Sequence, residues 1–186
     1  MSKFMIIHGS YGHPFENWIP WLHTHLSERG NKCMVPSFPT PDGQTFSSWE
    51  RLLNFYANEG ILDKSTTIIT HSVSCVFVVK FCVKNNFEIN RFISIAGFNN
   101  INFDYDPSLK NLCDSFYDSP EFLSKFKGLC PKRISFYSNN DPYVSLEKGA
   151  EFADAISAFP VLIPNAGHFN CPPNKYEFKE LLDYLK

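Results

Sequence analysis

The chain has 186 residues, of which 44% are hydrophobic and 19% are charged, so we expect one folded domain over residues 1–186 and exclude intrinsic disorder. Its 17 Lys and Arg residues and 19 Asp and Glu residues give a formal net charge of −2, with the two signs interspersed. This balance offers no electrostatic support for a nucleic-acid or anionic-membrane partner, and we expect neither.

Short apolar runs alternate with segments of helical periodicity along the chain. Strands are expected over residues 3–7, 32–35, 66–69, 91–95, 133–137 and 161–163. Helices are expected over residues 17–29, 145–158 and 176–185. Two further helices are expected, one that begins at a capping box formed by Ser47 and Glu50 and one that begins directly after Ser72. Strands that alternate with helices predict an α/β fold, a three-layer α/β/α sandwich around a parallel sheet with right-handed crossovers.

The segment over residues 99–131 is the least regular part of the sequence. Short helices are expected in it near residues 109–116 and 121–126. Because the segment is long and follows the end of a strand, we expect it to form a lid or a pocket wall.

Ser72 lies where the periodicity changes from strand to helix, in the sequence STTIITHSVSCVFVVK. The residues before it are β-branched and favour an extended strand, whereas Val76, Val79 and Val83 after it recur at helical spacing. A serine on such a turn presents its hydroxyl at the end of the sheet, above the start of the following helix. The stretch therefore predicts a nucleophile elbow.

Polar residues follow four of the predicted strands, in the sequences HGSYG, HSVS, SNNDPYVS and NAGHFN. Ligand chemistry in parallel sheets collects at these carboxyl ends. They hold Ser72, Asp141 and His168 in the chain order of α/β-hydrolases. A serine hydroxyl needs an imidazole to accept its proton as it attacks a carbonyl, and a carboxylate orients that imidazole. Asp114 and Asp118 are weaker candidates because they lie in the irregular segment.

An oxyanion needs preorganised donors, and we expect the backbone N–H of Val73 to be one of them. The second is expected from Ser10 or Tyr11, in the loop after the first strand. Gly9 opens this loop and would let its backbone approach a substrate. Two aromatic residues complete the candidates for substrate contact, namely Trp18, whose helical spacing also fits a core position, and Phe169, in a loop expected to be exposed.

Several other residues have plainer interpretations. His71 neighbours Ser72 along a strand and should point to the opposite face, so we expect it to pack. His8 and His13 have no carboxylate at ligand spacing, and the six cysteines show no zinc-site spacing. We expect no metal, no organic cofactor, reduced thiols and no nucleophilic role for Cys75. No apolar run is long enough for a membrane span and no signal-peptide pattern is visible, so a cytoplasmic location is expected.

Motifs along nearly the whole chain resemble the small, capless α/β-hydrolases of the YdeN-like type, which include the retinoblastoma-binding serine hydrolases. The matching segments are IIHGSYGHPFENWIPWLHTHL, VPSFPTP, THSVSC, SIAGF, SNNDPYVS and NAGHF. The resemblance implies a six-stranded sheet of order 2-1-3-4-5-6, no large cap domain, and Ser72, Asp141 and His168 as the triad. It also implies an esterase-like activity on small acyl esters through an acyl-enzyme.

The elbow departs from the family pattern, because Thr70 and Ser74 stand where that pattern has small residues, most often glycine. A second hypothesis is therefore a binding module on a hydrolase scaffold with little turnover. The retinoblastoma-binding relatives suggest an L-x-C-x-E peptide, but none of the six cysteines lies in one, so no motif supports a protein partner. We expect a small acyl substrate and a monomer or weak dimer.

Overall fold

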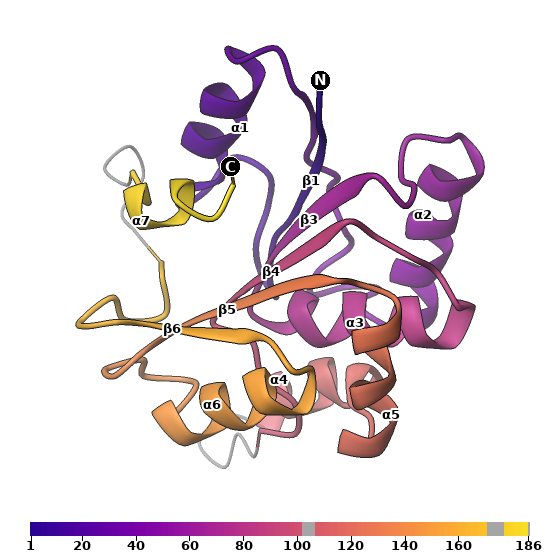
Figure 1. Cartoon of the computed structure of the whole chain (residues 1–186). Helices are drawn as coiled ribbons and strands as arrows, with labels where there is room; N and C mark the ends of the chain where they lie inside the picture. Colours follow the sequence, from indigo (N-terminus) through magenta and orange to yellow (C-terminus); the bar gives the residue numbers. More distant parts are fainter. Residues whose placement is uncertain (102–106, 171–176, 186) are drawn as a thin grey trace.

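The computed structural model describes residues 1–101, 107–170 and 177–185. A six-stranded sheet lies between helices on both of its faces (Figure 1). The strand order is β2-β1-β3-β4-β5-β6, every neighbouring pair is parallel, and both findings confirm the prediction. The strands are β1 (Lys3–Ile7), β2 (Lys32–Met34), β3 (Thr66–His71), β4 (Arg91–Ile95), β5 (Lys132–Ser138) and β6 (Phe159–Ile163).

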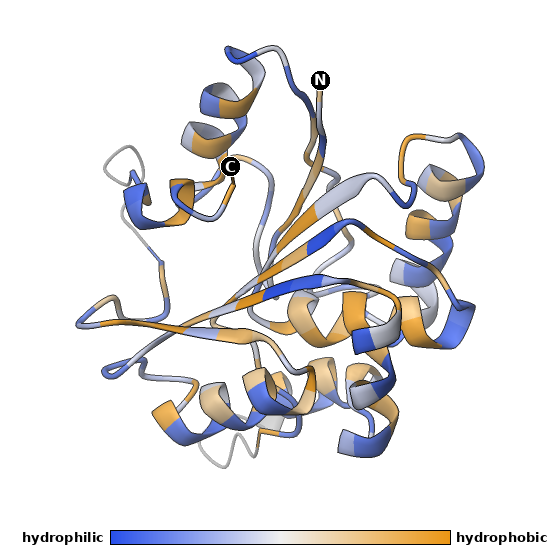
Figure 2. Ribbon diagram, in the orientation of Figure 1, coloured by the Kyte–Doolittle hydropathy of each residue, from blue (hydrophilic) through white to orange (hydrophobic). Residues whose placement is uncertain are grey.

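The strands are apolar on both faces, as a parallel sheet covered by helices requires. Phe4 and Ile6 of β1 pack into one hydrophobic cluster, whereas Met5 and Ile7 pack into the other. Successive side chains of a strand point to opposite faces, so one short run contributes to two cores. Hydrophobic residues are accordingly concentrated on the strands and on the sides of the helices that face them (Figure 2).

The helices form the two outer layers of the predicted sandwich. One face of the sheet packs against α1 (Ile19–Ser27) and α7 (Lys179–Leu182). The other face packs against α2 (Phe46–Asn58), α3 (Val73–Asn85), α4 (Pro107–Cys113), η1 (Asp114–Phe116), α5 (Pro120–Ser124), η2 (Lys125–Gly128) and α6 (Leu146–Ala155). No large cap domain covers the sheet in the part of the chain that the structure describes.

Four predicted helices have different bounds in the structure, and the first of them, α1, spans Ile19–Ser27 where 17–29 was expected. Helix α2 has Thr45 as its N-cap, whose hydroxyl accepts the N–H of Ser48 at 3.2 Å, so the expected capping box at Ser47 and Glu50 does not form. The Glu50 carboxylate instead accepts hydrogen bonds from Lys84 and Asn85 of α3. Helix α6 ends at Ala155 and α7 spans only Lys179–Leu182, and residue 176 lies outside the described residues.

In the described part of the irregular segment, a short helix lies near each of the two expected positions, and each is followed by a 3-10 turn. Residues 102–106 of this segment lie outside the described part of the chain. Cys33, Cys75, Cys82, Cys113 and Cys130 are free thiols, and Cys171 is not among the described residues. Within the described residues, no helix combines the length and apolar character that crossing a membrane requires.

Candidate active site

Ser72 forms a strained turn between β3 and α3. Every residue of β3 is buried, and the helix begins at Val73 directly after the serine. Ser72 has φ 60° and ψ −129°, a conformation that side-chain-bearing residues rarely adopt and that typically costs about 1–3 kcal/mol. The buried strand and helix on either side impose this turn, and the Ser72 N–H donates to the Ile95 carbonyl at 2.9 Å.

Gly9 brings the loop after β1 against this turn. A Cβ atom added at Gly9 would lie 2.8 Å from Ser72 Cβ and 3.2 Å from the His71 carbonyl oxygen. No real Cβ packs that closely against another side-chain carbon, so only glycine lets the two loops meet without displacement. The role that the structure supports for Gly9 is therefore close packing, at a position that also lines the cavity.

The unusual flanks of the elbow are both hydrogen-bonded. The Thr70 hydroxyl is fully buried and lies 3.2 Å from the Ile93 carbonyl oxygen and 3.2 Å from Cys75 Sγ. Ser74 Oγ accepts the His71 N–H at 3.0 Å, and it lies 2.8 Å from the His71 carbonyl oxygen and 3.0 Å from the Ile7 carbonyl oxygen at the end of β1. Because each hydroxyl has partners, these residues join the elbow to neighbouring strands and leave no buried polar group unsatisfied.

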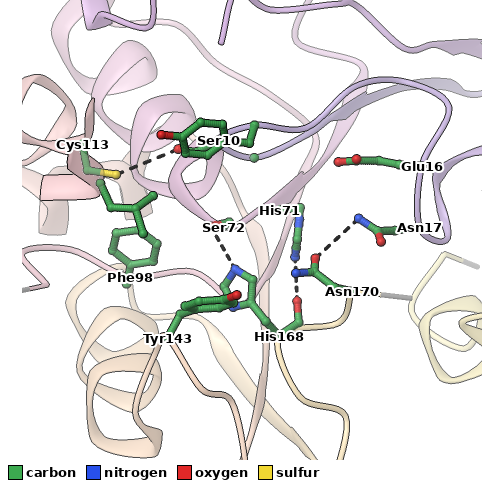
Figure 3. Close-up of a pocket in the computed structure, with 13 residues that line it drawn as sticks. Ser10, Glu16, Asn17, His71, Ser72, Phe98, Cys113, Tyr143, His168 and Asn170 are labelled. Atoms are coloured by element: carbon green, nitrogen blue, oxygen red, sulfur yellow. Dashed lines mark hydrogen bonds between the residues drawn. The ribbon is translucent and has the colours of Figure 1, made fainter. Parts of the chain in front are cut away.

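The structure brings Ser72, His168 and Asp141 into one hydrogen-bonded chain (Figure 3 shows the first link). His168 Nε2 lies 3.1 Å from Ser72 Oγ, and His168 Nδ1 lies 2.7 Å from Asp141 Oδ2. The carboxylate accepts, so Nδ1 carries the proton and Nε2 accepts the serine hydroxyl. The other Asp141 oxygen accepts the N–H groups of Tyr143 and Val144 at 2.8 and 3.0 Å, which holds the carboxylate toward the imidazole.

The side chains of residues 138–140, just before Asp141, form hydrogen bonds with the loop that carries His168. Ser138 Oγ accepts the N–H of residue 166 at 3.0 Å, and Asn140 Oδ1 accepts the N–H of Gly167 at 2.8 Å. Asn139 Oδ1 accepts the N–H of residue 165 at 2.8 Å. The polar run before Asp141 is therefore more than a turn sequence, because it holds the histidine loop beside the aspartate.

His71 is buried and packs as expected, but it also lines the cavity, which the sequence analysis did not predict. Its Nε2 lies 2.8 Å from the His168 carbonyl oxygen, which can only accept, so the Nε2 proton is donated to that carbonyl. The ring packs edge-on against Trp18 at 6.2 Å. Burial, and next the charge of His168, lower the pKa of His71 to about 3, so the ring is neutral at physiological pH.

The predicted oxyanion donors differ in what they already bind. Val73 begins α3, where the first N–H groups have no partner within the helix. Of the two alternatives that the prediction left open, Ser10 and Tyr11, the Tyr11 N–H already donates to Thr40 Oγ1 at 2.7 Å. Ser10 lines the cavity and is the remaining candidate of that loop.

Two residues that sequence reasoning did not identify as supports hold this loop. Gln44 is buried, and its amide donates to Ser10 Oγ at 2.8 Å and to the Leu112 carbonyl at 3.1 Å. His8 Nε2 accepts the Phe38 N–H at 3.0 Å, so its proton lies on Nδ1, 2.9 Å from the Gly9 carbonyl. Gln44 lies in no recognisable motif, and no sequence signal pointed to it.

A cavity of about 570 Å³ lies above Ser72, a volume typical of small-molecule sites. It is lined by Gly9, Ser10, Tyr11, Glu16, Asn17, His71, Ser72, Phe98, Leu109, Cys113, Tyr143, His168 and Asn170. Phe98, Leu109 and Cys113 come from residues 99–131 or the strand end before them, in agreement with the expected pocket wall. Most of the lining belongs to the strand-end loops that the sequence analysis singled out, although Glu16, Asn17 and Phe98 were not among the residues it named.

Two predicted substrate contacts are wrong. Trp18 and Phe169 are both fully buried in the hydrophobic cluster of α1 and α7, and Phe169 packs on Phe178 with ring centroids 5.3 Å apart. Neither side chain lines the cavity. The core interpretation of Trp18 is correct, and the loop after His168 turns Phe169 inward through a positive φ of 54°.

Neither a metal site nor a second nucleophile emerges from the described residues. No group of three or more His, Cys, Asp and Glu residues among them has the arrangement to hold a metal ion. Burial raises the pKa of the Cys75 thiol to about 12, so this cysteine is not a thiolate near neutral pH. Burial likewise raises the pKa of Cys113, at the wall of the cavity, to about 11.

Comparison with known proteins places this geometry in a family. The model of a family described as "Serine hydrolase" matches residues 4–186. The chain belongs to the serine hydrolase family. Serine hydrolase RBBP9 of Rattus norvegicus is 24% identical over 188 residues, which cover 100% of this chain and 94% of the relative. The putative hydrolase YdeN of Bacillus subtilis is 24% identical over 170 residues, which cover 90% and 86%.

Solved structures give this serine hydrolase the α/β-hydrolase fold. The crystal structure of the ydeN gene product from B. subtilis has a TM-score of 0.84 at 21% identity, covering 100% of this chain and 97% of that one. Est1E from Butyrivibrio proteoclasticus has a TM-score of 0.71 at 16% identity, covering 99% and 84%. Family membership and fold together identify a hydrolase of the YdeN and RBBP9 type.

Proposed function

We propose that the chain hydrolyses small acyl esters through a Ser72–His168–Asp141 triad and an acyl-enzyme intermediate. The observation that carries the proposal is the hydrogen-bonded chain from Asp141 through His168 to Ser72 at the floor of the cavity. Each residue has the partner that its role needs, and the imidazole has the required tautomer. The hydroxyl lies on a strained turn that exposes it to a bound substrate.

In the first half of the reaction, Ser72 Oγ attacks the substrate carbonyl carbon while His168 Nε2 accepts the hydroxyl proton. Asp141 stabilises the imidazolium through its bond to Nδ1. The tetrahedral intermediate collapses when the bond to the leaving group breaks, and the leaving alcohol takes the proton from Nε2. In the second half, water attacks the acyl-enzyme by the same proton path and releases the carboxylic acid and free Ser72.

The oxyanion of each intermediate is assigned to the backbone N–H groups of Val73 and Ser10. These residues follow the nucleophile and the first strand, the two positions from which this fold supplies donors. The bonds from Gln44 and His8 hold the Ser10 loop before substrate arrives, and such preorganisation is what makes an oxyanion donor effective. Loss of one donor typically raises the barrier by about 3–4 kcal/mol.

The binding-module hypothesis was motivated by Thr70 and Ser74. Because both hydroxyls have hydrogen-bond partners on neighbouring strands, no observation favours that hypothesis over hydrolysis. A cytoplasmic location and a monomer or weak dimer remain predictions from the sequence.

Labelling with a fluorophosphonate probe and hydrolysis of short p-nitrophenyl esters test the proposed function. We expect the wild-type chain to become labelled and to hydrolyse the esters, and Ser72→Ala to lose both properties. Cys75→Ala is the matched control, since it removes the nearby thiol and leaves the hydroxyl. Equal labelling of the wild type and Ser72→Ala would contradict the assignment.

A further inference from the structure

The cavity has two chemically different sides. Phe98 and Cys113 lie on one side of the Ser72–His168 pair, whereas Glu16, Asn17 and Asn170 lie on the other (Figure 3). Leu109 also lines the cavity and belongs to the same helix as Cys113, one turn before it. The Asn17 amide donates to Asn170 Oδ1 at 3.5 Å, which links the loop after β1 to the loop after His168. A substrate bound across Ser72 would contact both sides.

Glu16 is the acidic residue among the residues that line the cavity, and no Lys or Arg is among them. Its side chain is 27% exposed, and its nearest ion-pair partner is His13, 3.7 Å away and charged only when protonated. Within the described residues, no Lys or Arg forms an ion pair with Glu16. The polar side therefore has a carboxylate that no permanent cation neutralises in the described part of the protein.

The Glu16 carboxylate is held in place by the preceding turn. One oxygen packs so closely on Gly12 that a Cβ added there would lie 2.5 Å from it. The carboxylate also accepts the backbone N–H of His13. Burial raises the pKa of Glu16 above its ordinary value, because a partly dehydrated carboxylate is destabilised. A cation bound beside it would compensate for this loss of hydration.

We propose that the preferred substrate carries a cationic group that binds beside Glu16, with an apolar group on the Phe98 and Leu109 side. This inference rests on the proposed function, because it assumes that the scissile carbonyl lies at Ser72. Glu16 acts as a specificity-determining residue that favours esters with an ammonium group and disfavours anionic ones. The cationic group lies in the acyl part or in the alcohol part of the ester, depending on which part faces Glu16.

Two pairs of isosteric esters test the proposal. In each pair, one ester has a quaternary nitrogen where the other has a quaternary carbon. Butyrylcholine and 3,3-dimethylbutyl butyrate place the charge in the alcohol. The p-nitrophenyl esters of 4-(trimethylammonio)butanoic acid and 5,5-dimethylhexanoic acid place it in the acyl group. The measured quantity is the ratio of kcat/KM for the cationic ester to that for the neutral ester.

For the wild type we expect a ratio of about ten in one of the two pairs, and the responding pair reports which part faces Glu16. Glu16→Gln keeps the shape of the side chain and its capacity to accept the His13 N–H, and should bring the ratio to about one. Glu88→Gln is the matched control, since Glu88 is exposed just before the start of β4, at the end of the strands opposite to Ser72, and its loss changes net charge equally. This variant should retain the wild-type ratio.

The salt dependence of the wild-type ratio gives a second measurement that needs no variant. Because part of the Glu16 side chain is exposed, raising NaCl from about 0.02 to 0.5 M should lower the ratio severalfold. A wild-type ratio near one in both pairs, or a ratio that Glu16→Gln and salt leave unchanged, would overturn the proposal. Ser72-dependent hydrolysis of the neutral esters would still support the proposed function in that event, whereas its absence would count against that function.

Discussion

Substitution of Gly9 by alanine tests whether the loop after β1 must lie directly on the nucleophile elbow. The added Cβ would be 2.8 Å from Ser72 Cβ, which is 0.6 Å short of the 3.4 Å at which ordinary contact begins. The backbone of Gly9 does not have the positive φ that makes alanine unfavourable by itself, so the contact is the main perturbation. The two atoms nearest to the added Cβ are Ser72 Cβ and the His71 carbonyl oxygen, and neither can move without moving the elbow.

The expected consequence is a displacement of Ser72 Oγ relative to His168 Nε2, which lie 3.1 Å apart in the structure. Misplacement of a reacting group by about 1 Å can reduce the rate about 100-fold, so a shift of about half that size predicts a loss of about tenfold in kcat/KM. Overpacking of a dense site typically destabilises a protein by about 1–3 kcal/mol. We therefore expect a folded variant with a lower unfolding midpoint and impaired catalysis.

The assay measures kcat/KM on a p-nitrophenyl ester, the rate of fluorophosphonate labelling and the unfolding midpoint in urea. Gly128→Ala is the control, because a Cβ at Gly128 would meet nothing within 4 Å. It should retain wild-type kinetics and change stability by less than about 1 kcal/mol. Wild-type kinetics in Gly9→Ala would refute the reasoning, since the loop would then have room that the structure does not show.

Two further predictions concern the loop of His168. Asn140→Ala removes the acceptor of the Gly167 N–H, and we expect it to lower kcat/KM about tenfold and to destabilise the fold by about 1 kcal/mol. Asn139→Ala is the control, because its bond to residue 165 lies farther from His168, and it should lower kcat/KM less. Equal kinetics of the two variants would argue against a positioning role for Asn140. His71 has a pKa of about 3 against 6.5 in the unfolded chain, so stability is full above pH 6.5 and falls as the unfolded state takes up a proton. Between pH 7 and 5 the free energy of unfolding should fall by about 2 kcal/mol for this reason. His71→Gln can still donate to the His168 carbonyl but does not titrate, so urea titrations of this variant should show a smaller fall than those of the wild type. Identical pH dependence of the two would contradict the assignment.

The strands and the positions of the three proposed catalytic residues at their ends followed from local patterns in the sequence, whereas the strand order came from the family resemblance. Each strand is a short apolar run, and the carboxyl ends of parallel strands lie at one edge of the sheet. Polar residues that directly follow such runs must therefore meet, wherever they lie along the chain. Ser72, Asp141 and His168 meet for this reason, although they are separated by up to 96 positions.

Other features depended on which residues pack against one another across the fold. Helical spacing is the same for a core tryptophan and a pocket tryptophan, and only tertiary packing places Trp18 in the core. The engagement of the Tyr11 N–H by Thr40 and the support of Ser10 by Gln44 join segments about 30 residues apart that share no motif. Periodicity reports the environment of a residue averaged along one element, whereas these contacts depend on the distance between two elements.

Thr70 and Ser74 at the elbow show the same difference between what local sequence patterns predict and what tertiary contacts decide. The sequence by itself determined that a serine lies on a strand-to-helix turn, because the change of hydrophobic period is local. It also showed that the residues flanking the turn are unusual. Only the tertiary structure decided that these residues fit. The Thr70 hydroxyl lies 3.2 Å from the Ile93 carbonyl oxygen of β4, and the Ser74 hydroxyl lies 3.0 Å from the Ile7 carbonyl oxygen of β1, in addition to its local contact with the His71 carbonyl at 2.8 Å. A hydroxyl group is tolerated in a buried turn when other strands supply its partners, and those strands are adjacent only in the folded chain.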